Sequence, residues 1–153
     1  MALALLLNFQ ALRVFAEGAE DFEQKDFLVL DFNADYIKAV KMAQSAAKKL
    51  SLRYDSQGLL KNKEIGLTEA KKVCKENGWD FPCYVSRGRG KEDSYLSVEY
   101  SESYKKMGKK RYVIMAGFAA KGDPGIRKLL ERVKKIYPGA QILEEKVYIG
   151  CMH

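Results

Sequence analysis

The segment from residue 111 to 150 constrains the fold most, because a buried strand, a capped helix and a second strand follow one another there. Residues 112–116 form a continuous apolar run, Tyr-Val-Ile-Met-Ala, which is typical of a central strand. Asp123 and Pro124 then supply an N-cap and a proline suited to the first helical turn. Apolar residues recur at three- and four-residue steps after this cap, and Pro138 marks the helix end. The segment is therefore predicted to be a β-α-β unit.

A similar order of elements is expected in residues 27–60. Residues 27–32 have the composition of a short buried strand, and Asn33 is expected to cap the helix that follows. Residues expected on the inner side of this helix are Ile37, Val40, Ala43, Ala47 and Leu50. Residues 52–54 are expected to form the next strand. Because this plan recurs in residues 111–150, a weak internal duplication is predicted.

The middle of the chain is predicted to contain a short helix and a hairpin. The helix is expected to begin at Thr68 and to stop at Asn77 and Gly78. Residues 83–100 are predicted to be a hairpin with its tip at residues 88–93. Alternation in its second arm puts Tyr95, Ser97 and Glu99 on one face, and Leu96, Val98 and Tyr100 on the other. A chain of 153 residues has room for one domain. The predicted fold class is α+β: a single domain with two β-α-β-type units and a hairpin, forming a mostly antiparallel sheet backed by helices.

The N-terminal residues bear on the cellular location. Residues 1–16 combine an apolar run with small or β-branched residues near position 16, and acidic sequence follows from Glu17. This pattern predicts a cleaved signal peptide and a folded part covering residues 24–153. The alternative is an N-terminal helix that packs on the domain. It is supported by the absence of a basic residue before the apolar run, where a signal peptide usually has one, and by Arg13, which lies on the C-terminal side of that run. The run is too short to cross a bilayer as a helix. We therefore expect a periplasmic or extracellular protein of the cell envelope without a membrane span.

Three cysteines fit an exported protein, because thiols form disulfides outside the cytosol. Cys74 lies near the end of the predicted short helix, and Cys83 follows it closely after a turn. A disulfide between Cys74 and Cys83 is therefore expected, with Cys151 buried or free. The alternative is three buried, reduced cysteines, since small apolar positions often hold this residue.

Residues that carry common catalytic chemistry are scarce. The one histidine is the terminal His153, which disfavours Ser-His-Asp and Cys-His mechanisms. The cysteine spacing matches no zinc motif. Carboxylate pairs such as Glu144 and Glu145 stand next to lysine, as ordinary surface charges do. We therefore expect no catalytic residues, no cofactor and no metal.

A binding role accounts better for the composition. The formal net charge is +7 and the pI is about 9.2, which favours anionic partners. A tyrosine ring can pack on the CH groups of a sugar, and an arginine can hold a carboxylate in a bidentate pair. The residues expected to bind a ligand are Tyr84, Arg87, Arg89, Tyr95, Tyr100 and Tyr112. The alternative is that half or more of these tyrosines are core or half-buried strand residues, because strands favour tyrosine.

The strand from Tyr112 to Phe118 and the helix after it resemble the SPOR (sporulation-related) repeat, a small peptidoglycan-binding domain. Residues 27–32 resemble the same motif more loosely. The resemblance implies an antiparallel sheet backed by helices, whose exposed face binds glycan strands of the bacterial cell wall. The predicted function is that of an exported envelope module that recognises peptidoglycan glycan, or another anionic cell-wall ligand, without catalysis.

Two other functions are compatible with the sequence. A basic α/β protein could bind nucleic acid by stacking bases on strand aromatics, although export would place it away from nucleic acid. A structural or assembly protein could use a free sheet edge to pair with another chain.

Overall fold

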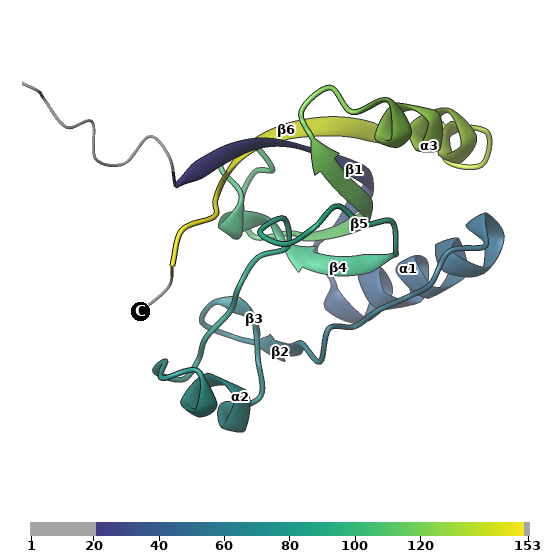
Figure 1. Ribbon diagram of the computed structural model, residues 1–153. Helices are drawn as coiled ribbons and strands as arrows, with labels where there is room; N and C mark the ends of the chain where they lie inside the picture. Colours follow the sequence, from purple (N-terminus) through teal and green to yellow (C-terminus); the bar gives the residue numbers. More distant parts are fainter. Residues whose placement is uncertain (1–20, 152–153) are drawn as a thin grey trace, which may run out of the picture.

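A four-stranded antiparallel sheet, in the order β4-β5-β1-β6, forms the centre of the molecule in the computed structural model, which describes residues 21–151 (Figure 1). The strands are β1 (Phe22–Asn33), β4 (Ser97–Tyr100), β5 (Tyr112–Ala120) and β6 (Gln141–Tyr148). Helix α1 (Tyr36–Leu50) follows β1, and α3 (Pro124–Lys134) follows β5. Each helix joins two strands that lie on either side of a third one, which is the split β-α-β arrangement. The predicted α+β fold class is confirmed.

The main core lies between the sheet and the two helices. Leu28 and Leu30 of β1 and Ile114 of β5 face the helices. The inner side of α1 consists of Ala39, Ala43, Ala46, Ala47 and Leu50. The prediction that Ile37 faces inward is wrong, because this side chain is 62% exposed. It precedes Ala39 by two residues, which is about 200° around a helix, so the two side chains point in opposite directions.

The caps of the two long helices follow from short polar side chains. Asp35, and not the predicted Asn33, caps α1 by accepting a hydrogen bond from the backbone N–H of Lys38 at 2.9 Å. Asp123 caps α3 as predicted, accepting from the N–H of Ile126 at 2.9 Å, and Pro124 is the first helical residue. After α3, β6 runs without interruption and pairs with β1.

The other face of the sheet is also covered. Tyr104 and Met107, from the segment between β4 and β5, pack on Phe27 and Met115 in a second apolar cluster. The buried carboxylate of Glu145 accepts hydrogen bonds from two backbone N–H groups of this segment, at 3.1 and 2.5 Å. The SPOR resemblance implies an exposed sheet face, but this face is covered here by the segment between β4 and β5.

Residues 51–96 form an insert between α1 and β4, and its β2, β3 and α2 lie at the bottom of the view in Figure 1. It contains β2 (Leu60–Asn62), β3 (Gly66–Thr68) and α2 (Lys71–Glu76). The predicted disulfide between Cys74 and Cys83 is confirmed, and Cys151 is a free, exposed cysteine. The prediction that Thr68 caps the short helix is wrong. This residue belongs to β3, and its hydroxyl accepts a hydrogen bond from the backbone N–H of Cys83.

The hairpin predicted for residues 83–100 does not form. Its second arm becomes β4, which pairs with the apolar strand β5, while residues 83–87 form no strand. Residues 53–55 stand beside Leu96 where the first arm was expected, because the N–H of Leu96 donates to the carbonyl of Arg53 and the N–H of Asp55 donates to that of Leu96. Arg87 is buried, and its guanidinium donates to the carbonyl of Tyr95. The alternation predicted for the second arm is correct: Leu96 and Val98 face the helices.

The strand predicted at residues 52–54 is also wrong. Only a single bridge joins Tyr54 to Leu96, so β4 takes the place of that strand in the first β-α-β unit. The predicted signal peptide, residues 1–16, lies outside the described residues. In residues 21–151, no helix combines the length and apolar character that a membrane crossing requires.

Candidate functional site

A small pocket of about 260 Å³ lies where the start of β1 meets the end of β6, and we call it the basic-aromatic pocket. It is lined by Phe22, Tyr84, Val85, Ser86, Arg89, Ser103, Tyr104, Lys105, Lys146, Val147 and Tyr148. Three of these described residues are cations, four are aromatic and none is a carboxylate. Such a lining attracts an anionic group and offers apolar ring faces beside it.

Strand register builds the aromatic floor of this pocket. Phe22 and Tyr148 stand opposite each other in the β1-β6 ladder, and their ring centroids are 5.2 Å apart in an edge-to-face arrangement. The Lys146 ammonium lies 5.0 Å from the centre of the Phe22 ring, and the Arg89 guanidinium lies 5.2 Å from that of Tyr148. Arg89 also donates a hydrogen bond to the carbonyl of Gly150. The two cations are therefore held against the rings and not spread into solvent.

Two tyrosines connect the pocket wall to the interior. The hydroxyl of Tyr84 donates to the carboxylate of Glu99, and the hydroxyl of Tyr104 lies 3.4 Å from the same Glu99 oxygen. Glu99 is fully buried. It also accepts hydrogen bonds from Ser97 and Gln57, at 2.8 and 2.5 Å. Burial, followed by the negative charge of Glu99, raises the pKa of both Tyr84 and Tyr104 well above the ordinary value. These hydroxyls therefore remain neutral donors, and their contacts with the buried Glu99 hold the pocket wall in place.

Two of the six predicted binding residues, Tyr84 and Arg89, line the pocket together. Arg87 does not, because its side chain is buried in an ion pair with Asp93 and donates to Ser97 at 2.8 Å. The buried guanidinium is thus fully occupied by protein groups and lies out of reach of an external ligand.

The other three predicted residues are dispersed. Tyr95 lies between two guanidinium groups, 3.7 Å from that of Arg87 and 4.8 Å from that of Arg53. Tyr100 and Tyr112 pack against each other with ring centroids 5.4 Å apart, at the core on the helix side of the sheet. Tyr112 is buried, and its hydroxyl lies 3.4 Å from the carbonyl of Gly66. The six residues therefore do not form one surface.

Several pocket residues were not anticipated from the sequence. They are Phe22, Tyr104, Lys105, Lys146 and Tyr148. The alternating aromatic and basic residues at the end of β6 were the available signal. The decisive information is the register of β1 against β6, which a single sequence does not contain.

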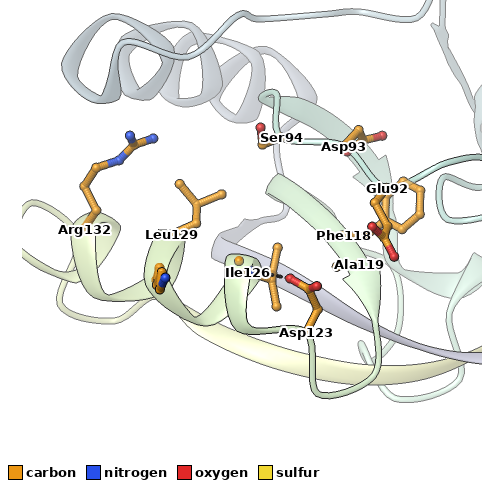
Figure 2. A pocket seen from close by; sticks show the side chains of 11 residues that line it. Glu92, Asp93, Ser94, Phe118, Ala119, Asp123, Ile126, Leu129 and Arg132 are labelled. Carbon is orange, nitrogen blue, oxygen red and sulfur yellow. Dashed lines mark hydrogen bonds between the residues drawn. The ribbon is translucent and has the colours of Figure 1, made fainter.

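A second and larger groove runs along α3, with a volume of about 610 Å³ (Figure 2). Its lining contains Glu92, Asp93 and Asp123 as well as Lys128 and Arg132. The carboxylates make it a poorer site for an anionic ligand than the basic-aromatic pocket. Within residues 21–151, no group of three or more His, Cys, Asp or Glu side chains is arranged to hold a metal ion.

The basic-aromatic pocket is therefore the candidate site, on the basis of its charge, its rings and its support by buried hydrogen bonds. Comparisons of the chain with protein-family models, with curated proteins and with solved structures found no match.

Proposed function

We propose that this protein is an exported, non-catalytic binding module of the cell envelope, and that it recognises an anionic glycan of the peptidoglycan type. The observation that carries this proposal is the lining of the basic-aromatic pocket, where cations and aromatic rings meet without a carboxylate among the described residues. A carboxylated sugar has the matching features: a negative group, CH-rich ring faces and hydroxyls.

The geometry of the pocket supports a ligand of this kind. The edge-to-face pair of Phe22 and Tyr148 can pack against the apolar face of a sugar ring. Arg89 uses one N–H for the Gly150 carbonyl, and its remaining donors are suited to a carboxylate. A volume of about 260 Å³ is below the range of roughly 300–1,000 Å³ that is usual for drug-sized ligands, so the pocket suits a single ring.

The disulfide supports the proposed location. Disulfides persist in oxidising compartments such as the periplasm and the extracellular space. Cys83 directly precedes Tyr84, so the bond to Cys74 anchors one end of the segment that forms the pocket wall. An oxidising environment would thus preserve the pocket.

A nucleic-acid function has weaker support. Bases would have to stack on the strand aromatics of the sheet face that lies away from the helices. Tyr104 and Met107 cover this face, and the strand ring of Phe118 there is buried. We therefore favour the envelope ligand.

Co-sedimentation with insoluble peptidoglycan tests the proposal. The protein should sediment at low salt, and Arg89→Ala combined with Lys146→Ala should weaken binding at least tenfold. Lys41→Ala combined with Lys38→Ala removes two exposed positive charges from α1, so this Lys41 control matches the charge change of the double variant and should bind like the original protein. Free N-acetylmuramic acid should compete better than N-acetylglucosamine, because only the former has a carboxylate. The proposal would be wrong if the protein stays in solution, or if the Lys41 control loses as much binding as the double variant.

A further inference from the structure

We propose that the groove along α3 binds a short, extended peptide that carries an amino group at one end and a carboxylate at the other. The groove shares no lining residue with the basic-aromatic pocket, so this site is independent of the proposed function. Its lining, which defines the α3 groove, consists of Glu92, Asp93, Ser94, Phe118, Ala119, Asp123, Gly125, Ile126, Lys128, Leu129 and Arg132.

The walls of the α3 groove are rigid. On one side, Asp93 and Phe118 form a pair of backbone hydrogen bonds at 3.2 and 3.1 Å, which fixes residues 92–94 on β5. Gly117 permits this close approach, because a Cβ there would lie 2.6 Å from the carbonyl oxygen of Asp93. On the other side, α3 is held by its Asp123 cap. A site formed by two fixed walls needs little ordering when a ligand binds.

Opposite charges stand at the two ends of the α3 groove. Glu92 and Asp123 lie at one end and Arg132 at the other, as Figure 2 shows. Lys128 precedes Arg132 by one helical turn, so both cations lie on the same side of α3. In the part of the chain that the structure describes, none of these four residues forms an ion pair. Asp93 differs from them, because Arg87 already neutralises it.

The spacing of these charges indicates the length of the ligand. Asp123 and Arg132 are nine positions apart along the helix, which corresponds to about 14 Å at 1.5 Å per residue. An extended peptide covers this span with about four residues at roughly 3.3 Å each. Between the charged ends, the half-buried Leu129 presents apolar surface for one side chain of the ligand, next to the buried Ile126.

This combination selects a peptide among the common ligands. A single amino acid is too short to reach both charged ends of the groove. A polyanionic glycan or nucleic acid would be repelled by Glu92 and Asp123. A peptide with free ends places its ammonium at these carboxylates and its carboxylate at the Arg132 guanidinium, which can hold it in a bidentate pair.

Nuclear magnetic resonance of the ¹⁵N-labelled full chain tests this site. The probe is the peptide Ala-Leu-Ala-Glu with free ends, and the comparison is Ala-Leu-Ala-Ala with acetylated and amidated ends. The free peptide should shift the amide signals of Ala119, Ile126 and Leu129 in a saturable way at millimolar concentration. The blocked peptide should bind at least tenfold more weakly. An absence of saturable shifts at these residues up to 20 mM, or equal binding of both peptides, would overturn the proposal.

Substitutions that remove one charge but keep a similar side-chain shape give a second test, because such variants are expected to stay folded. Arg132→Gln should weaken peptide binding at least fivefold, and so should Asp123→Asn, which removes the charge but keeps a good N-cap residue. Lys134→Gln changes the same charge on the same helix outside the groove and should have no effect. Equal losses in all three variants would contradict the site. Arg132→Gln should still sediment with peptidoglycan, so failure of the peptide site and failure of the proposed function remain distinguishable.

Discussion

Tyr84 donates a hydrogen bond to the buried carboxylate of Glu99, which ties a wall residue of the basic-aromatic pocket to the polar interior of the sheet. The phenol therefore has two separate roles. Its ring lines the pocket, and its hydroxyl is one of the hydrogen-bond donors to the buried Glu99 carboxylate. Stability and ligand binding can be separated at this residue, because a phenylalanine keeps the ring and loses only the hydroxyl.

Tyr84→Phe should lower the free energy of unfolding by about 1.5–3 kcal/mol, the usual value of a hydrogen bond to a charged group. Urea denaturation followed by circular dichroism measures this change. Tyr95→Phe is the control and should leave stability nearly unchanged, because the Tyr95 hydroxyl has no hydrogen bond to another described residue. Peptidoglycan binding by Tyr84→Phe should be kept. An equally stable Tyr84→Phe protein would show that this hydrogen bond contributes nothing.

Local signals in the sequence predicted the elements whose causes are local. Asp123 and Pro124 start α3, and the apolar run that begins at Tyr112 is a central strand, because caps and composition act within a few residues. The disulfide from Cys74 to Cys83 was predictable for the same reason, since a short segment joins the two residues.

The pairing of strands that lie far apart in the sequence was not predictable. The strand that pairs with residues 97–100 could have been the nearby segment 83–87, but it is β5, which offers a longer apolar surface. The candidate site also depends on long-range strand pairing. Phe22 and Tyr148 are far apart in the chain, and only the β1-β6 register brings their rings together. Arg87 resembled a ligand-binding cation in the sequence, and only the structure reveals that Asp93 occupies it.

Gly117→Ala should destabilise the fold by about 1–3 kcal/mol, the usual cost of an overpacked site. The added Cβ would lie 2.6 Å from the carbonyl oxygen of Asp93 and 3.2 Å from the Cα of Ser94, and neither backbone atom can rotate away. Thermal and urea unfolding measure the effect. Gly139→Ala is the matched control, because a Cβ at that position has no heavy atom within 4 Å. Similar stabilities of the two variants would contradict the close packing at Gly117.

One thiol should react in the denatured, unreduced protein, and three should react after reduction, because only Cys151 is free among the described cysteines. Counting with a thiol reagent tests this. The double change Cys74→Ala and Cys83→Ala should lower the free energy of unfolding by about 2–4 kcal/mol, since the unfolded chain then regains the entropy of an open loop. Cys151→Ala should leave stability unchanged. Three reactive thiols before reduction would show that the disulfide is absent.

Asp55→Asn should make the protein less sensitive to acid. The backbone N–H of Gln57 donates to Asp55 at 2.8 Å and lowers the pKa of this carboxyl below its ordinary value of 3.8. Near that pH the unfolded state therefore binds more protons than the folded state. The contribution of Asp55 to stability is complete at pH values above its ordinary pKa, and it is lost as the pH falls through the folded pKa. Urea unfolding at pH 3, 4, 5 and 6 should show a smaller loss on acidification for Asp55→Asn than for the original protein.

Glu69→Gln should change the same pH profile in the opposite direction. Burial, followed by the charge of Glu99, raises the pKa of the Glu69 carboxyl above its ordinary value of 4.5. Between the ordinary and the folded pKa the folded state binds more protons, so the contribution of this group to stability decreases as the pH rises. The stability of Glu69→Gln should therefore improve relative to the original protein between pH 4 and pH 6. If the two variants changed the slope in the same direction, the opposite environments of Asp55 and Glu69 would be refuted.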